Sequence, residues 1–179
     1  MPRYSTPAIV LHWLIALLIV GTFTLGLVMT DIPGLSPTKL KYFAWHKWAG
    51  VTVLLLATLR LLWRLFRAPP AYPASMRSWE KSVAHATHLA LYVLMFAVPI
   101  SGYLFSTAAG VPVVYFGLVQ LPVLFAKAPA WKEPLEELHY WLNMGMAALV
   151  AGHVLAALKH YFVDRDGVLQ RMLPFGSAR

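Results

Sequence analysis

Four of the seven histidines in this chain have the spacing of paired metal ligands inside an apolar helical protein: His12, His46, His139 and His153. The last two lie 14 residues apart, with no Lys, Arg, Asp or Glu between them. In one helix this spacing is about 21 Å along the axis and about 40° short of four full turns, so both rings lie on one face. Two imidazoles so placed could each bind a haem iron, and an electron could pass between the irons.

Paired imidazoles favour electron transfer over oxygen chemistry. Each neutral ring gives one nitrogen to iron, while its other nitrogen donates to a carbonyl or hydroxyl oxygen. Two such ligands fill both axial positions. The chain has no cysteine, which excludes iron–sulfur ligation and covalently attached haem, so any haem is b-type. Small residues near the ligands would admit a flat macrocycle, although they also serve ordinary helix packing: Ala49, Gly50, Gly145, Ala151 and Gly152.

The elements that must position these histidines are membrane helices. The chain is 59% hydrophobic and 12% charged, with a mean hydropathy of +0.63, whereas a soluble domain carries about 25% charged residues. A span needs roughly 20 apolar residues. The sequence predicts one all-α domain over residues 1–179, an integral membrane four-helix bundle with spans at about 8–29, 45–66, 84–107 and 136–161.

The sequence also predicts the form of one connecting loop and the start of the last helix. Residues 111–126 contain no charge but are interrupted by glycine and proline, so we expect an apolar loop that dips into the membrane interface. We expect Pro134 to open the last helix, with Glu136 and Glu137 in its first turn, where acidic residues are favoured. The first apolar stretch is too long for a signal peptide, so we expect it to be retained.

The basic residues predict the orientation. Ten lie in the N-terminus, the 60–81 connection and the tail from 159 to Arg179, against five on the other side. The positive-inside rule therefore places both termini in the cytoplasm. This distribution accounts for the net charge of +8 and leaves no basic face for phosphates, which argues against a nucleic-acid partner.

The predicted depth of each histidine in the membrane indicates which two histidines could share a haem. Only His46 and His139 fall on the far side, so a haem there has one pairing, whereas on the cytoplasmic side we favour His12 with His153 because both lie inside the hydrocarbon. The remaining three either line a quinone pocket, with His88 and His160 as the candidates, or make headgroup contacts, as we expect for His85. Haem propionates need cations, and Lys47 and Arg64, the latter within the Arg60–Arg67 cluster, are the candidates.

Several short motifs resemble a known family. Leu11-His12-Trp13-Leu14 opens the first span, His46-Lys47-Trp48-Ala49-Gly50 the second, and Ala84-His85-Ala86-Thr87-His88 the third, which ends in Pro99-Ile100-Ser101-Gly102-Tyr103. Leu138-His139 and His153 follow, and His160-Tyr161-Phe162-Val163-Asp164-Arg165-Asp166 closes the pattern. Over nearly its whole length the chain resembles the bacterial cytochrome b561 family of four-helix di-haem proteins. It is also similar in pattern to the cytochrome b subunits of membrane hydrogenases and formate dehydrogenases.

The resemblance implies a multi-pass cytochrome of the bacterial inner membrane and respiratory chain. It implies two b haems on His12, His46, His139 and His153, with ubiquinone as the cytoplasmic partner. One branch of the family oxidises superoxide and passes the electron to ubiquinone, but the loop Ser106–Gly117 departs from that branch. We therefore expect an electron carrier that exchanges with the quinone pool and a periplasmic redox partner. The alternatives are a superoxide:ubiquinone oxidoreductase and a haem-free scaffold or transporter component.

Overall fold

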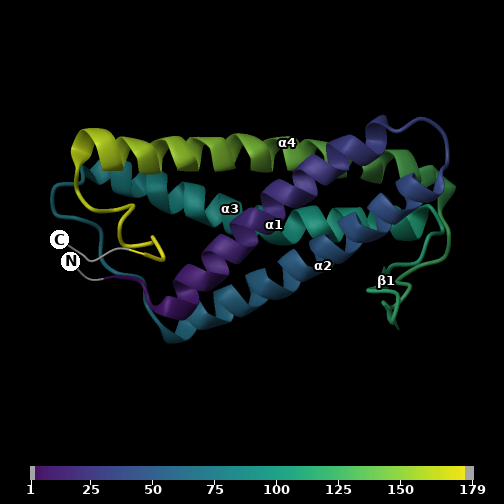
Figure 1. Ribbon diagram of the computed structural model, residues 1–179, viewed down its shortest axis with the longest axis horizontal. Helices are drawn as coiled ribbons and strands as arrows, with labels where there is room; N and C mark the ends of the chain where they lie inside the picture. Colours follow the sequence, from purple (N-terminus) through teal and green to yellow (C-terminus); the bar gives the residue numbers. More distant parts are fainter. Residues whose placement is uncertain (1–2, 176–179) are drawn as a thin grey trace.

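The structure is a computed structural model that describes residues 3–175, and within them four long helices form an antiparallel bundle (Figure 1). They are α1 (Thr6–Asp31), α2 (Pro37–Phe66), α3 (Ser78–Ala108) and α4 (Pro129–Lys159). Each is long and apolar enough to cross a membrane, which confirms the predicted all-α, four-span bundle. A π-helical turn, His160–Asp164, continues α4. Arg179, which contributes to the predicted orientation, lies outside the described residues.

Helices α2, α3 and α4 begin well before their predicted spans, and at the first two of them a side-chain hydrogen bond caps the start. Helix α2 was expected to begin near residue 45 but begins at Pro37, where the Ser36 side chain accepts a hydrogen bond from the Lys39 amide at 3.1 Å. Helix α3 begins at Ser78 and not near residue 84, and Glu80 accepts from the Arg77 amide at 3.0 Å. Hydropathy locates only the apolar centre of each helix.

The start of α4 corrects a specific prediction. The helix begins at Pro129, not at Pro134, which lies inside it. Proline at the first helical position loses no hydrogen bond, because that N–H has no helical partner, and Pro129 fills this role. Pro134 removes one bond near the helix start, and the helix continues through it. Glu136 and Glu137 therefore lie beyond the first turn.

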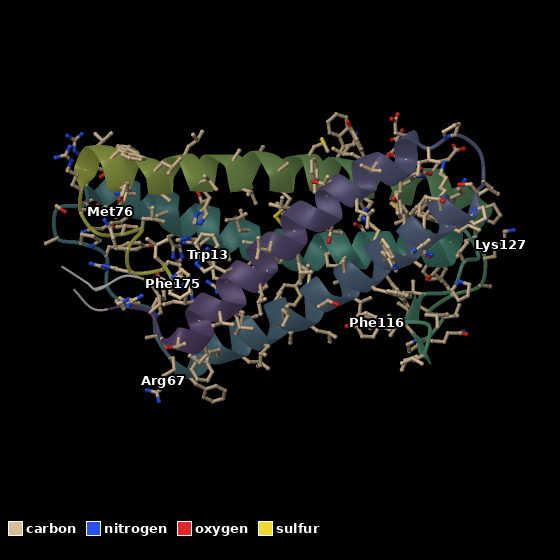
Figure 2. The ribbon with its side chains drawn as sticks, in the orientation of Figure 1. Trp13, Arg67, Met76, Phe116, Lys127 and Phe175 are labelled. Atoms are coloured by element: carbon tan, nitrogen blue, oxygen red, sulfur yellow. The ribbon has the colours of Figure 1, made fainter. Side chains whose placement is uncertain are left out.

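The two ends of the bundle differ in how the helices are joined. At one end, which we call the hairpin end, a small antiparallel hairpin pairs β1 (Val114–Tyr115) with β2 (Val119–Gln120), where the sequence predicted only an apolar loop. The Trp48 indole donates to the Val114 carbonyl at 2.7 Å, and the Thr52 hydroxyl lies 2.9 Å from that of Tyr115. The hairpin is therefore held against α2, with Phe116 at its tip (Figure 2).

At the opposite end, which we call the terminal end, the C-terminal segment 166–175 packs across the helix ends. The indole of Trp13 donates to the Met172 carbonyl at 2.8 Å, and Arg3 donates to the Leu173 carbonyl at 2.6 Å. Arg171 donates to the Ala71 carbonyl at 2.6 Å. The segment thus ties the end of α4 to the start of α1 and to the connection between α2 and α3 (Figures 1 and 2).

The small core lies at mid-height and draws one buried residue from each helix: Ile15, Ala57, Met95 and Met146. Helix α1 packs mainly on α2, and α3 packs mainly on α4, so the bundle consists of two helical hairpins (Figure 1). Large apolar side chains are exposed on the outside, for example Leu17 at 68% and Leu155 at 66%. Such a surface is unfavourable in water and suits a lipid environment.

Candidate functional site

The structure brings the four predicted ligand histidines together as two pairs. At the hairpin end, the ring centres of His46 on α2 and His139 on α4 are 6.2 Å apart. At the terminal end, those of His12 on α1 and His153 on α4 are also 6.2 Å apart. Both pairs join the first helical hairpin to the second, and both match the pairing predicted from depth.

This separation leaves room for one metal ion between the two rings. A metal–nitrogen bond of about 2.0–2.1 Å plus roughly 1.1 Å from nitrogen to ring centre, counted on both sides, gives about 6.2–6.4 Å. His88 also approaches the terminal pair, but its ring centre is 5.4 Å from that of His153, which is too short for axial ligation of one metal between them. The residues therefore fit two bis-imidazole centres, and the geometry favours His12 over His88 as the partner of His153.

Hydrogen bonds orient the rings of the hairpin-end pair. His46 Nδ1 lies 3.1 Å from the Thr22 carbonyl oxygen, and His139 Nδ1 lies 3.0 Å from the Val98 carbonyl oxygen. The Ser101 hydroxyl is also 3.0 Å from His139 Nδ1. Because a carbonyl oxygen only accepts, Nδ1 carries the proton in both rings, and Nε2 keeps the lone pair that a metal needs.

Two glycines allow these rings to lie against the neighbouring helices. A Cβ on Gly102 would stand 2.8 Å from His139 Cε1, and one on Gly26 would stand 3.2 Å from His46 Cε1. The sequence did not single out either residue for this role. The glycines that it did single out leave open space, because a Cβ would meet no atom within 4 Å at Gly50, Gly145 or Gly152. Open space at those positions is compatible with a large planar ligand.

An apolar layer separates the two pairs. Met146 lies seven residues from both His139 and His153, which is two helical turns in each direction. It is buried at 5% exposure and belongs to the core cluster with Ile15, Ala57 and Met95. The two candidate metal centres therefore lie at different depths of one bundle, one nearer each end.

Each predicted propionate partner lies on α2 at the level of one pair. Lys47 follows His46 at the hairpin end. Arg64 lies toward the terminal end, with its guanidinium 5.6 Å from the centre of the Tyr92 ring. Arg60, from the same basic cluster, donates to the Ala8 carbonyl at 2.7 Å. One cation is thus available near each pair.

Besides the two histidine pairs, the terminal end contains a cluster of polar side chains around His160. Its Nδ1 is 2.7 Å from Asp166 Oδ2 and 3.0 Å from Asp164 Oδ2. His160 and Asp166 are both buried, at 7% and 8% exposure. Sequence reasoning named His160 but missed the two aspartates. The sequence did contain a signal for this cluster, because the two aspartates follow His160 by only four and six residues.

Comparisons with known proteins identify the family of this chain. A sequence model of the family described as prokaryotic cytochrome b561 matches residues 3–175. The chain is 39% identical over 171 residues to cytochrome b561 homolog 2 of Escherichia coli (strain K12), covering 96% of this chain and 91% of that protein. It is 28% identical over 175 residues to homolog 1 of the same strain, with 97% and 98% covered. A Yersinia pestis protein named probable superoxide oxidase CybB is 30% identical over 177 residues, with 96% of each chain covered.

Proposed function

Because the chain belongs to the prokaryotic cytochrome b561 family, we propose that it carries electrons across a membrane through two b haems. His46 and His139 would hold one haem, and His12 and His153 would hold the other. The observation that carries this proposal is that both histidine pairs have a ring separation of 6.2 Å, which would leave room for one iron bound by both imidazoles. Each bound haem supplies a reversible one-electron centre.

The protein's own residues set the properties of these centres. Two imidazoles per iron leave no coordination position for oxygen, which favours electron transfer. The Thr22 and Val98 carbonyls fix the tautomers of the hairpin-end ligands. Lys47 and Arg64 are available to neutralise the haem propionates, one near each pair. The apolar layer at Met146 excludes water between the centres.

We place the terminal end in the cytoplasm and the hairpin end in the periplasm of a bacterial inner membrane. The excess of basic residues at the terminal end supports this orientation. Ubiquinone exchanges electrons at the terminal end, where His88 contacts the His153 ring and His160 lies beyond it. A periplasmic redox partner, or a small donor, meets the hairpin end.

A second candidate function is superoxide:ubiquinone oxidoreduction, which the likeness to the Yersinia pestis protein supports. A catalyst for this anionic radical gains from positive potential over the outer centre. The hairpin end offers five basic residues, including Lys39, Lys41 and Lys47, against four acidic ones. A net charge of +1 at this end would attract superoxide only weakly, so electron transfer across the membrane remains the first proposal.

The deciding experiment combines a haem count with rapid mixing. Purified protein is expected to contain two b haems per chain, by pyridine haemochrome assay. The oxidised protein is then mixed with superoxide and, separately, with ubiquinol, and haem absorbance is followed. Reduction by ubiquinol alone supports the carrier. Near-diffusion-limited reduction by superoxide, followed by electron delivery to added ubiquinone, supports the enzyme. If the purified protein shows no haem absorbance, the alternative of a haem-free scaffold or transporter component is supported instead.

The His153→Ala variant tests the pairing. It removes one ligand at the terminal end only, so we expect loss of that haem and retention of the other, about one haem per chain. The remaining haem should keep a bis-histidine spectrum, because His46 and His139 are unchanged. Two haems in this variant, with a bis-histidine spectrum at both, would show that His88 or another residue serves in place of His153.

A further inference from the structure

The β1–β2 hairpin lies against the outer face of α2, the face that points away from the histidine pairs. Trp48 and Thr52, the two α2 residues that hold the hairpin, follow His46 by two and six residues. At about 100° per residue, they lie roughly 200° and 240° around the helix from His46, which faces His139 on α4. The hairpin therefore extends outward, on the side of α2 away from α4 (Figure 1).

This outer face of α2 continues as an apolar stripe that suits lipid. Leu55, Leu59 and Leu62 follow Thr52 at intervals of three or four residues, so they lie in line with it along the helix. Each of these leucines is about half exposed, and in a helix that crosses a membrane such side chains face acyl chains. The hairpin covers the part of this stripe that carries an indole N–H and a hydroxyl, and it supplies the partners of both groups.

The depth of these contacts places them inside the bilayer. Ala57 belongs to the apolar core at mid-height, and Thr52 and Trp48 precede it by five and nine residues. These separations are about 8 Å and 14 Å along the helix, and a tilted helix brings both residues closer to the membrane mid-plane. Half of the hydrocarbon core of a bilayer is about 15 Å thick. Both anchoring residues therefore lie within the hydrocarbon when the core of the bundle is at its centre.

Hydrocarbon admits irregular backbone only where its polar groups are paired within the protein, and much of the hairpin backbone is paired in this way. Carbonyl oxygens on and before β1 accept hydrogen bonds from protein donors: Val111 from the Ser106 hydroxyl at 2.7 Å, Val113 from the Leu121 amide at 2.9 Å and Val114 from the Trp48 indole at 2.7 Å. After β2, the Tyr103 hydroxyl donates to the Pro122 carbonyl. Pro112 and Pro122 carry no N–H that would need a partner.

The tip of the hairpin is apolar where a turn in water is usually polar. Backbone φ is positive at both Phe116 and Gly117, at 50° and 72°. Turns of this form favour Asn or Asp before the glycine, and a bulky residue is disfavoured there. Phe116 instead stacks on Trp48, with 5.1 Å between ring centres, and Leu118 beside it is 85% exposed. A tip of this composition is unfavourable in water and compatible with acyl chains.

We propose that the hairpin is a re-entrant element that inserts Phe116, Leu118 and Val119 among the acyl chains of the leaflet at the hairpin end. The partner is lipid, because these three side chains offer neither charge nor a hydrogen bond and continue the lipid-facing stripe of α2. The sequence predicted contact with the membrane interface only, whereas this placement carries the hairpin past the headgroups. It requires neither haem nor electron transfer.

Spin labelling in lipid vesicles tests this placement, because the chain has no cysteine of its own. Leu118→Cys carries a nitroxide label on the hairpin, and Leu35→Cys, 86% exposed between α1 and α2, is the matched control at the same end. Oxygen concentrates in hydrocarbon and a nickel chelate stays in water, so power saturation with each reagent reports the surroundings of the label. In vesicles of phosphatidylethanolamine and phosphatidylglycerol, we expect the label at 118 to collide more with oxygen and the label at 35 to collide more with nickel.

The other possible surroundings give different patterns. Strong nickel access and weak oxygen access at position 118 would place the hairpin in water and overturn the proposal. Weak access of both reagents would show that a second copy of the chain or another protein covers the tip, which also overturns it. Unchanged circular dichroism shows that both labelled variants are folded.

A second variant tests the insertion with the label away from the tip. Leu118→Asp places a carboxylate in the hydrocarbon, where an unpaired charge is costly, so the hairpin should leave the membrane. A nitroxide at Val123→Cys, which is also exposed, should then gain nickel access and lose oxygen access. Leu118→Ala is the control and should leave both unchanged. Equal accessibility in the Asp and Ala variants would contradict the insertion.

Discussion

The Thr22 and Val98 carbonyls decide which ring nitrogen the hairpin-end histidines offer to a metal. Each carbonyl accepts from Nδ1, so Nε2 points away from the helix that supplies the oxygen. Gly26 and Gly102 let those rings approach closely enough for the bonds to form. The orientation of these two rings therefore depends on residues of α1 and α3.

Gly102→Ala is expected to disturb the hairpin-end haem. The new Cβ would stand 2.8 Å from His139 Cε1, so the ring must move and its bond to the Val98 carbonyl must lengthen. Loss of such an orienting contact costs about 10- to 100-fold in metal-site affinity. Haem titration of the variant, with optical and EPR spectra, measures this.

Gly21→Ala is the matched control, because a Cβ there meets no atom within 4 Å and the residue is exposed on α1. In the middle of a helix, alanine is about 1 kcal/mol more favourable than glycine, so this variant should be as stable as the wild type or more so. Equal haem affinity in both variants would show that the close approach at Gly102 does not matter for binding.

At the scale of single residues, the sequence predicted the candidate ligand histidines but not the residues that orient their rings. His139 and His153 could be recognised because an uncharged helix of known rise relates them. Gly102 and Thr22 could not be recognised, because their role depends on which helix lies opposite each ring. That arrangement arises from the packing of neighbouring helices, α1 on α2 and α3 on α4, and leaves no periodic signal in the chain. The same holds for Asp166, which meets His160 only after the chain turns back at the end of α4.

At the scale of elements, apolar stretches located the helices, and caps set their limits. Ser36 and Pro129 extend α2 and α4 beyond the hydrophobic centres from which the spans were predicted. The 114–120 hairpin was missed because its strands are two residues long and uncharged on both faces, so alternation gives no signal. Its position depends on contacts with α2, chiefly the one made by Trp48.

Trp48→Phe should loosen this hairpin without unfolding the bundle. Phenylalanine keeps an aromatic ring beside Phe116 but loses the indole bond to the Val114 carbonyl. One such bond contributes about 0.5–1.5 kcal/mol. Amide exchange of Leu121, whose N–H donates to the Val113 carbonyl, should therefore rise by about two- to tenfold. The exposed Trp131, changed to Phe, is the control, and equal exchange in the two variants would contradict the anchoring role.

At the scale of the whole molecule, the absence of cysteine allows a direct test of orientation. Leu35→Cys introduces a thiol at the hairpin end, and Ala74→Cys introduces one at the terminal end, both at exposed positions. We expect a membrane-impermeant maleimide applied to intact spheroplasts to label the first and to label the second only after lysis. Unchanged haem absorbance shows that each variant is folded. The reverse pattern would place the proposed quinone site in the periplasm.

Haem should also hold the molecule together, because each histidine pair takes one ligand from the first helical hairpin and one from the second. Among the residues described, the hairpins contact each other chiefly through α2 and α3, so two bound haems would add links that the apolar packing lacks. A ligand at 1,000 times its Kd stabilises the folded state by about 4 kcal/mol. For a chain of this size each such site raises the melting temperature by roughly 8–16 °C. Circular dichroism of holo-protein, haem-depleted protein and His153→Ala should give three melting temperatures, with the single-haem variant between the other two. Identical melting of all three would mean that the histidine pairs do not join the hairpins.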